Sequence, residues 1–450
     1  MPQYSRPGSV PSPSILLIFL LAGGGWLAAV AAEGAAGRQP ASAGACADQE
    51  AGQAPGQAPG QASDQGTQDP TMDAFDLLAR LRHKEKPPEE AGAFDYHKRM
   101  LAFAPVIGAK PSSGLVFGVA GAVAFYKGDP KTTRISSAVL SLTFSTKKQT
   151  SISGRFTMFT RDDRWRVEGD NRALWTSQDA YGLGTGTTPG DRINVKYDFF
   201  RVYETGYYQL HPGLYAGLGV HFNDHTNVRP GSGTEDEAFE TSPYVQYSEK
   251  HGFDLNTQIS GGASVNLLWD DRDNQINPDH GWYANGSVRT FFKGFLGGDS
   301  TWQEVYLDTR TYARLKHSSR HKLAFWLFGD FVVGGVAPYL DLPATGMDTY
   351  GRTGRGYGEG RFRGERLLYG EVEYRATLMR NGLIGMVAFL NVTTVTNLET
   401  GERLFHTLAP GGGAGLRLLL NKHSKTNICL DVGFGKEGSH GVYLAVQEAF

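Results

Sequence analysis

The residues best suited to chemistry gather in one stretch, Gly351 to Arg375, which reads GRTGRGYGEGRFRGERLLYGEVEYR. Its first half is rich in glycine and carries the arginines Arg352, Arg355, Arg361, Arg363 and Arg366. A guanidinium presents a rigid fork of N–H donors, so it pairs well with a carboxylate or a phosphate. The chemistry on offer is therefore an ion pair inside the protein or the binding of an anion outside it.

The second half of this stretch alternates between two faces. One face carries Leu368, Gly370, Val372 and Tyr374, and the other carries Glu371, Glu373 and Arg375. Such period-2 alternation is typical of a β-strand. The basic loop therefore leads into a strand with one charged face, and charged side chains need a polar environment.

The rest of the chain offers no catalytic arrangement. It contains no HExxH, GxSxG or metal-spaced Cys/His group. The cluster Asp270-Asp271-Arg272-Asp273 has the composition of a calcium site, but a charged turn is the simpler interpretation. The two cysteines, Cys46 and Cys429, imply no disulfide framework, and the net charge of −2 does not favour nucleic acid. We expect no enzymatic activity, no cofactor and no metal.

From about Met100 to Phe450 the period-2 pattern continues, interrupted by clusters of Gly, Asp, Asn, Pro and Lys. It predicts sixteen strands: Leu101–Ala109, Gly114–Tyr126, Arg134–Ser145, Thr150–Thr160, Trp165–Trp175, Ile193–Gln209, Gly213–Phe222, Gln258–Trp269, Trp282–Phe292, Thr301–Leu315, Lys322–Val333, Leu367–Leu378, Ile384–Val395, Gly411–Leu420, Thr426–Phe434 and Gly441–Phe450.

The connections between these strands also alternate. Links after even-numbered strands are mostly short, whereas several links after odd-numbered strands are long, for example Asn223–Thr257 and Gly334–Arg366. Alternation of faces fits a soluble sheet as well, but sorted loops and aromatic strand ends favour a closed transmembrane β-barrel. We therefore expect an all-β chain, a 16-stranded antiparallel barrel with polar side chains inside and apolar side chains outside.

The N-terminal part has a different composition. Residues 1–32 combine Arg6, an apolar run and small residues, which predicts an export signal peptide, with an uncleaved anchor helix as the alternative. Residues 33–70 are of low complexity and predict a flexible linker. In the lead-in 71–99, Met72 to Lys86 predicts a short helix, either a solvated linker helix or one that docks on the barrel.

Three features occur in an order and spacing that resemble the BamA/TamA-type outer-membrane proteins, the bacterial surface-antigen superfamily. The first is WDDRDNQINPDHGWY, with the turn residues Asp270, Arg272, Asp273, Asn277, Pro278 and Gly281. The second is the loop with Arg355-Gly356-Tyr357 and the strand that follows it. The third is a C-terminal strand that ends in the aromatic Phe450. The resemblance covers about Met100–Phe450.

The resemblance implies that the loop after the eleventh strand folds into the lumen. Its tip, formed by Arg355, Gly356 and Tyr357, would then meet acidic and aromatic residues of the next two strands, namely Glu371, Glu373, Phe389 and Asn391. Asn391 departs from the family, which usually has an aspartate there, so the resemblance leaves Glu373 alone or a weaker lock as options. The alternative interpretation is an exposed basic loop that binds lipopolysaccharide.

The resemblance also implies a location in the bacterial outer membrane and a role in protein or lipid insertion or translocation. Residues 33–95 are too featureless for a POTRA docking domain, so a separate periplasmic partner would be needed. Other expected partners are outer-membrane lipid, lipopolysaccharide and the assembly machinery that inserts the barrel itself. A passive or plugged pore and a structural surface antigen remain alternatives.

Overall fold

The computed structural model describes residues 71–81, 99–110, 113–315, 320–422 and 425–450. All of them belong to the unit Gly66–Phe450. The predicted signal peptide, 1–32, and the predicted linker, 33–70, lie outside the described residues. The structure therefore concerns the predicted barrel, 100–450, and part of its lead-in, 71–99.

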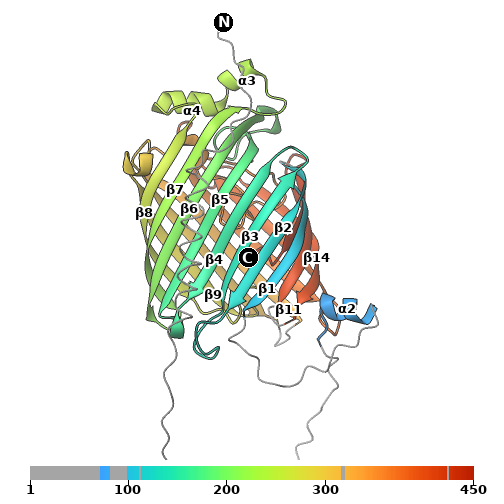
Figure 1. Ribbon diagram of the computed structural model, residues 1–450. Coiled ribbons are helices and arrows are strands. Elements are labelled where there is room, and N and C mark those ends of the chain that lie inside the picture. Colours follow the sequence, from blue (N-terminus) through green and yellow to red (C-terminus); the bar gives the residue numbers. More distant parts are fainter. Residues whose placement is uncertain (1–70, 82–98, 111–112, 316–319, 423–424) are drawn as a thin grey trace, which may run out of the picture. The chain divides into compact units, whose positions relative to one another are not determined.

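One antiparallel sheet contains all the strands in sequence order, and it curls into a barrel (Figure 1). The strands are β1 (Met100–Lys110), β2 (Gly114–Phe125), β3 (Ser136–Ser145), β4 (Thr150–Phe159), β5 (Trp165–Ala180), β6 (Ile193–His211), β7 (Leu214–Pro230), β8 (Gln258–Asp270), β9 (Gly281–Phe291), β10 (Trp302–Arg314), β11 (His321–Gly335), β12 (Arg366–Thr377), β13 (Ile384–Val395), β14 (Ala409–Asn421), β15 (Thr426–Gly435) and β16 (His440–Val446). The predicted 16-stranded antiparallel barrel is confirmed.

Two strand predictions are too short and one is too long. β7 continues from Phe222 to Pro230, and β5 continues from Trp175 to Ala180. The residues added to β7 are mostly polar on both faces, so the alternation that marks a strand disappears there although the ladder with β6 goes on to Pro230. β16, by contrast, ends at Val446 instead of Phe450.

The two faces of the barrel wall differ in polarity as expected. On β10, the side chains of Glu304, Asp308 and Arg310 are buried, whereas Leu307 between them is exposed on the outside. The outer face carries many large exposed apolar side chains, such as Phe103, Leu218 and Leu390. Polar side chains therefore face the lumen and apolar side chains face outward.

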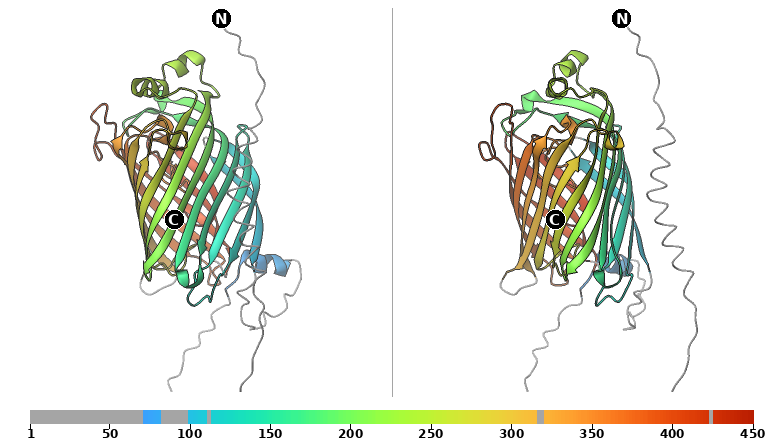
Figure 2. Two further views of the ribbon diagram at one scale, coloured as in Figure 1. Left: turned by 60° about the vertical axis from the view of Figure 1, so that its left-hand side comes forward. Right: turned by 90° about the vertical axis from the view of Figure 1, so that its left-hand side faces the viewer.

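Helices occupy the two ends of the barrel (Figure 2). At one end, the link between β7 and β8 forms α3 (Asp236–Glu240) and α4 (Pro243–His251). At the other end lies α2 (Ala74–Leu81), part of the helix predicted from Met72 to Lys86. Lys422 Nζ reaches Asp76 of α2 at 3.2 Å, which fixes this helix beside the β14–β15 turn. None of the helices in the described part of the chain has the length and apolarity of a membrane span.

Short 3₁₀ segments complete the links: η2 (Arg161–Asp163), η3 (Pro189–Asp191), η4 (Phe295–Gly297) and η5 (Tyr339–Asp341). η5 belongs to the long link 336–365 between β11 and β12. Tyr339 of η5 packs between Tyr244 and Tyr247 of α4, with ring centroids 5.6 and 5.7 Å apart. The core at the α4 end of the barrel is therefore formed jointly by α4 and the link 336–365.

Candidate functional site in the barrel lumen

The link 336–365 folds into the barrel, as the sequence predicts, and Arg363 holds it there. The Arg363 guanidinium donates to the main-chain oxygens of Tyr339, Leu340 and Leu342 at 2.9 to 3.1 Å. Its other terminal nitrogen donates to Gln178 of β5 at 2.9 Å. One buried arginine thus connects two parts of the link to each other and connects the link to β5 of the barrel wall.

The tip of the link is a tight turn that needs glycine. Asp348 accepts hydrogen bonds from the main-chain N–H groups of Arg352 and Thr353, at 2.9 and 2.8 Å. Gly356 has φ +106°, and a Cβ there would lie 2.6 Å from the main-chain oxygen of Phe434 on β15. Any larger residue would be strained and would push the tip away from the wall.

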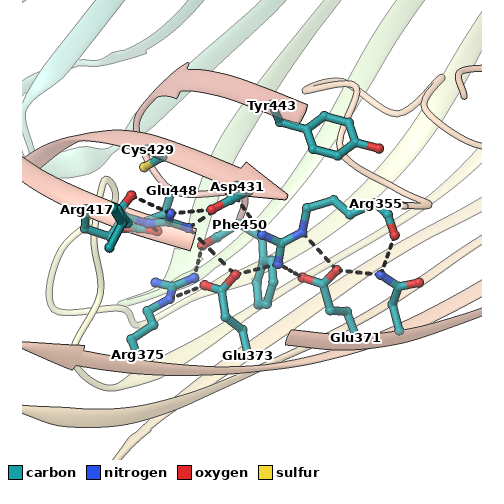
Figure 3. Close-up of polar contacts among 12 residues, drawn as sticks. Arg355, Glu371, Glu373, Arg375, Arg417, Cys429, Asp431, Tyr443, Glu448 and Phe450 are labelled. Atoms are coloured by element: carbon teal, nitrogen blue, oxygen red, sulfur yellow. Dashed lines mark hydrogen bonds and ion pairs between the residues drawn. The ribbon is translucent and has the colours of Figure 1, made fainter. Parts of the chain in front are cut away.

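Arg355 is the centre of the site, with a side chain that is almost completely buried (Figure 3). Its guanidinium contacts the carboxylates of Glu371 and Glu373 on β12. Its Nη1 also lies 2.9 Å from Asp431 Oδ2 on β15. The guanidinium carbon stands 3.7 Å from the ring centroid of Phe389 on β13. The guanidinium therefore has carboxylate partners along its edges and an aromatic ring on one face, as a buried charge requires.

The side chains of Asn391 and Tyr443 fix the main chain around Arg355. Asn391 Nδ2 donates to the Arg355 main-chain oxygen at 2.9 Å. The Gly356 N–H donates to Tyr443 Oη of β16 at 3.0 Å, and that hydroxyl donates to the Tyr357 oxygen at 3.1 Å. The structure thus brings together Arg355, Gly356, Tyr357, Glu371, Glu373, Phe389 and Asn391.

The sequence analysis missed Asp431, and the option that Glu373 alone accepts Arg355 is wrong. Asp431 supplies the carboxylate that position 391 lacks, from β15 instead of β13. The alternation Asn427, Cys429, Asp431 within β15 places Asp431 on the lumenal face, so a signal was present. The exposed basic loop is also wrong for Arg355, because its guanidinium is buried among carboxylates.

The ion pairs continue beyond Arg355 (Figure 3). Glu373 also accepts from Arg375 at 2.6 Å, and Asp431 pairs with Arg417 of β14. Arg417 Nε in turn donates to Glu448 at 2.7 Å. Arginines and carboxylates thus alternate in one connected network, in which Glu373 and Asp431 are each shared between two or more arginines.

Phe450 does not lie at the end of a strand, which corrects the sequence prediction. After β16 ends, residues 447–450 fold into the lumen, where Phe450 is only 5% exposed. Its ring lies 5.2 Å from Trp326 of β11, and its main-chain oxygen accepts from Arg375 at 2.9 Å. The ion pair between Arg417 and Glu448 and the hydrogen bond from Arg375 to Phe450 hold this segment on its inward path.

The turn motif between β8 and β9 forms a second, separate set of ion pairs. Asp270 is fully buried and accepts from Arg166 and Arg272 at 2.9 and 2.8 Å. Arg134 also lies 3.3 Å from it. These contacts join β5 and the β2–β3 link to the turn, so Asp270 and Arg272 serve as structural residues.

The other motif residues shape the same turn. Asp273 Oδ1 accepts the main-chain N–H groups of Asp279 and His280 at 2.8 and 3.1 Å. Lys322 Nζ donates to Asn277 Oδ1 at 3.0 Å and to the Pro278 oxygen at 3.3 Å. At Gly281, with φ +106°, a Cβ would lie 2.8 Å from the Arg272 main chain. The motif therefore closes a tight charged turn.

Asp279 of this turn is paired with two lysines. Burial raises the pKa of its carboxyl, but Lys322 and Lys425, both 3.0 Å away, outweigh burial and hold the pKa below its usual range. No group of three or more His, Cys, Asp or Glu side chains in the described ranges has a metal-binding arrangement.

A cavity of about 50 Å³ lies between the link 336–365 and the wall, lined among others by Arg289, Glu304, Asp330 and Asp341. This volume suits a few water molecules and is far below that of a small-molecule site. This part of the lumen is therefore densely packed and lined by charged side chains.

Comparison with known proteins gives similarity at the level of structure. The chain matches no protein-family model, and no curated protein matches it in sequence. The solved structure of BamA from Haemophilus ducreyi lacking POTRA domains 1–3 is similar, with a TM-score of 0.51, 13% identity and coverage of 78% of this chain and 69% of that chain.

Two structures of CdiB are also similar. CdiB from Acinetobacter baumannii has a TM-score of 0.49 and 10% identity, covering 78% of this chain and 59% of that chain. CdiB from Escherichia coli has a TM-score of 0.49 and 11% identity, covering 77% and 62%. At such identities the BamA match shows the fold alone: this chain has a BamA-like barrel.

The first prediction concerns Arg355→Ala. Removing the cation leaves Glu371, Glu373 and Asp431 buried without their shared partner, which costs about 3–5 kcal/mol. The folded barrel migrates faster than the unfolded chain on cold detergent gels. When samples are heated before loading, we expect this folded form to be lost at a clearly lower temperature in Arg355→Ala than in the unmodified chain. Arg366→Ala, at an exposed site at the start of β12, is the control and should leave that temperature unchanged. An unchanged Arg355→Ala protein would contradict the lumenal lock.

The second prediction concerns Asn391→Asp, which restores the residue usual in the resembling family. Here it should destabilise the barrel, because a carboxylate would face the Arg355 main-chain oxygen at 2.9 Å and Glu371 at 3.4 Å. Loss of a donor that leaves buried acceptors unpaired costs about 1–3 kcal/mol. The double variant Asn391→Asp/Asp431→Asn keeps the carboxylate number and should recover part of the loss in heat stability. A more stable single variant would contradict the role assigned to Asp431.

Proposed function

We propose that this chain is an integral barrel of the bacterial outer membrane, of the BamA/TamA type. Its role is to assist the insertion or translocation of proteins or lipids, together with a separate periplasmic partner. The apolar outer face supports the membrane location, since a barrel satisfies its main-chain hydrogen bonds internally, as hydrocarbon demands. The outer face then contacts lipid and lipopolysaccharide, and the assembly machinery of the cell inserts the barrel.

The observation that carries the insertion role is the seam between the first and last strands. Every consecutive pair from β1–β2 to β15–β16 is joined by a hydrogen-bonded ladder. β1 and β16 are the ends of this sheet and lie side by side, and within the described residues no ladder joins them. β16 is also short, with 7 residues against 11 in β1.

An unpaired strand edge has a direct chemical consequence. Its free N–H and C=O groups are costly in lipid, and they form a template on which another strand can add by main-chain hydrogen bonds. A client strand at the β1 edge would satisfy groups that β16 leaves unpaired. The partner supplies client recognition, because residues 33–95 lack the composition of a docking domain. The proposal involves no enzymatic step.

The third prediction tests the membrane location through two equally exposed positions. Leu390 near the middle of β13 is 67% exposed, and Phe405 in the β13–β14 link is 66% exposed. An arginine at the lipid midplane costs about 2–4 kcal/mol. Leu390→Arg should therefore lower the free energy of folding into lipid vesicles by that amount, while Phe405→Arg should have little effect. Equal effects of the two substitutions would refute a lipid-facing wall.

The fourth prediction tests the seam by locking it, in a background without Cys46 and Cys429. A Cβ at Gly108 of β1 would lie 3.8 Å from the main-chain oxygen of Leu444, so β1 and β16 are adjacent at this height. The side chains of Leu444 and of Ile107, the neighbour of Gly108, both project outward, so a short thiol cross-linker can join Ile107→Cys to Leu444→Cys. We expect the locked barrel to reduce the abundance of other outer-membrane proteins in isolated membranes.

The matched control shares one of the two cysteines. Leu430 of β15 and Leu444 of β16 are already ladder partners, so cross-linking Leu430→Cys to Leu444→Cys restrains nothing new. This control should leave the membrane composition unchanged. Full function of the seam-locked barrel would exclude a role for the β1 edge.

A further inference from the structure

A carboxyl group and a carboxamide meet on the outer face of the barrel between β5 and β6. Asn171 Nδ2 donates to Glu204 Oε1 at 2.8 Å. Glu204 stands opposite Val220 of β7, whose side chain is 49% exposed on the outside. The next residue after Asn171, Arg172, points the other way and donates to Thr349 of the inward link at 2.6 Å. Both polar side chains therefore project from the wall away from the lumen.

The height of this pair along the wall follows from its distance to an aromatic pair. Trp165 and Tyr208 are exposed at one end of β5 and β6, with ring centroids 5.0 Å apart, as expected at a membrane interface. Glu204 lies four residues from Tyr208, which is about 13 Å along a strand and about 10 Å along the axis of a tilted barrel. The outward-facing apolar band of a membrane barrel is about 25 Å tall, so Glu204 lies near the middle of such a band.

The surface beside the pair is covered at Gly169 and open at Gly206. A Cβ at Gly169 would lie 2.3 Å from the Phe156 ring and 2.9 Å from the Glu204 carboxylate, so both side chains lie over Gly169. A Cβ at Gly206, two residues from Glu204 on the same face, would have no atom within 4 Å. A second backbone can therefore approach closely beside the carboxyl group.

Strand pairing between β5 and β6 is made by the main chain, and one acceptor of the pair is left without a partner. The β5–β6 ladder runs from Trp165–Tyr208 to Ala180–Ile193 without it. Asn171 Oδ1 is buried and finds no hydrogen-bond partner among the described residues. An ionisable group and an unpaired acceptor at this depth are costly, and such groups mark functional positions in membrane proteins.

We propose that Glu204 and Asn171 form a lateral docking site for a membrane-spanning segment of another protein. The acceptors, Glu204 and Asn171 Oδ1, fit a donor such as the ammonium of Lys, the guanidinium of Arg or the amide of Asn or Gln. Lipid headgroups lie at the interfaces and do not reach this depth. A second copy of this chain related by a two-fold axis at this site would bring the same acceptors face to face. The proposal rests on the membrane location proposed above.

The first test asks whether the Asn171–Glu204 pair only stabilises the folded barrel. The purified full-length chain is folded into phosphatidylcholine vesicles and unfolded in urea. Glu204→Leu should leave the urea midpoint unchanged or raise it, because a charged group leaves the lipid face. A lower midpoint would mean that the Asn171–Glu204 bond only stabilises β5–β6, and it would overturn the docking site. Failure of the unmodified chain to fold into vesicles would overturn the membrane location as well.

The second test looks for the partner in native membranes. A photoreactive residue at Val220, beside Glu204, should form an adduct with one protein, and the same probe at the outward Leu327 of β11 should not. The Val220 adduct should fall at least tenfold with Glu204→Leu and return with Glu204→Asp. Mass spectrometry should place the cross-link in a membrane segment of the partner that contains a Lys, Arg, Asn or Gln. Substitution of that partner residue by Leu should abolish the adduct.

The contrary outcomes are distinct. An adduct that persists with Glu204→Leu, an adduct with lipid only, or one with the mass of two copies of this chain would each overturn the docking site. None of these outcomes would affect the membrane location, because the vesicle experiment reports on that separately.

Discussion

The constraint on which the lumen depends is the cost of burying the Arg355 guanidinium. An unpaired charge in such an interior costs several kcal/mol, so the fold must deliver carboxylates to it. Glu371 and Glu373 come from β12 and Asp431 comes from β15. The inward path of the link 336–365 follows, as does the glycine at 356, since only a bare backbone approaches β15 closely enough.

The need to pair buried arginines also affects the end of the sheet at β16. Glu373 and Asp431 are shared with Arg375 and Arg417, and these arginines draw residues 447–450 into the lumen. Because that segment turns inward, β16 stops at Val446 and leaves β1 without a full-length neighbour. The charge network inside the barrel therefore accounts for the short length of β16 at the seam.

Charged and polar side chains are arranged differently in the lumen and on the outer face of the barrel. Lumenal charges such as Arg355, Asp270 and Arg310 pair with other side chains of the same chain, so they contribute to the rigidity of the barrel. On the outer face, the Asn171–Glu204 pair keeps an acceptor unused amid apolar neighbours. The two features that we propose for contacts with other proteins, the unpaired edge of β1 and the Asn171–Glu204 pair, therefore both lie in the wall and not in the lumen.

The sequence by itself determined the strands, their order and their faces, because period-2 alternation and turn residues are local. That Arg355 meets Glu371 and Glu373 followed from the resemblance of the loop and of the next strand to BamA/TamA-type proteins, and the structure has these contacts. Only the tertiary structure decided that Asp431 is the third carboxylate and that Glu448 and Phe450 turn inward. These contacts join strands far apart in the chain, and they depend on how the barrel closes, which alternation does not encode. The alternation even misled at Phe450, because a strand-like pattern continues where ion pairing ends the strand.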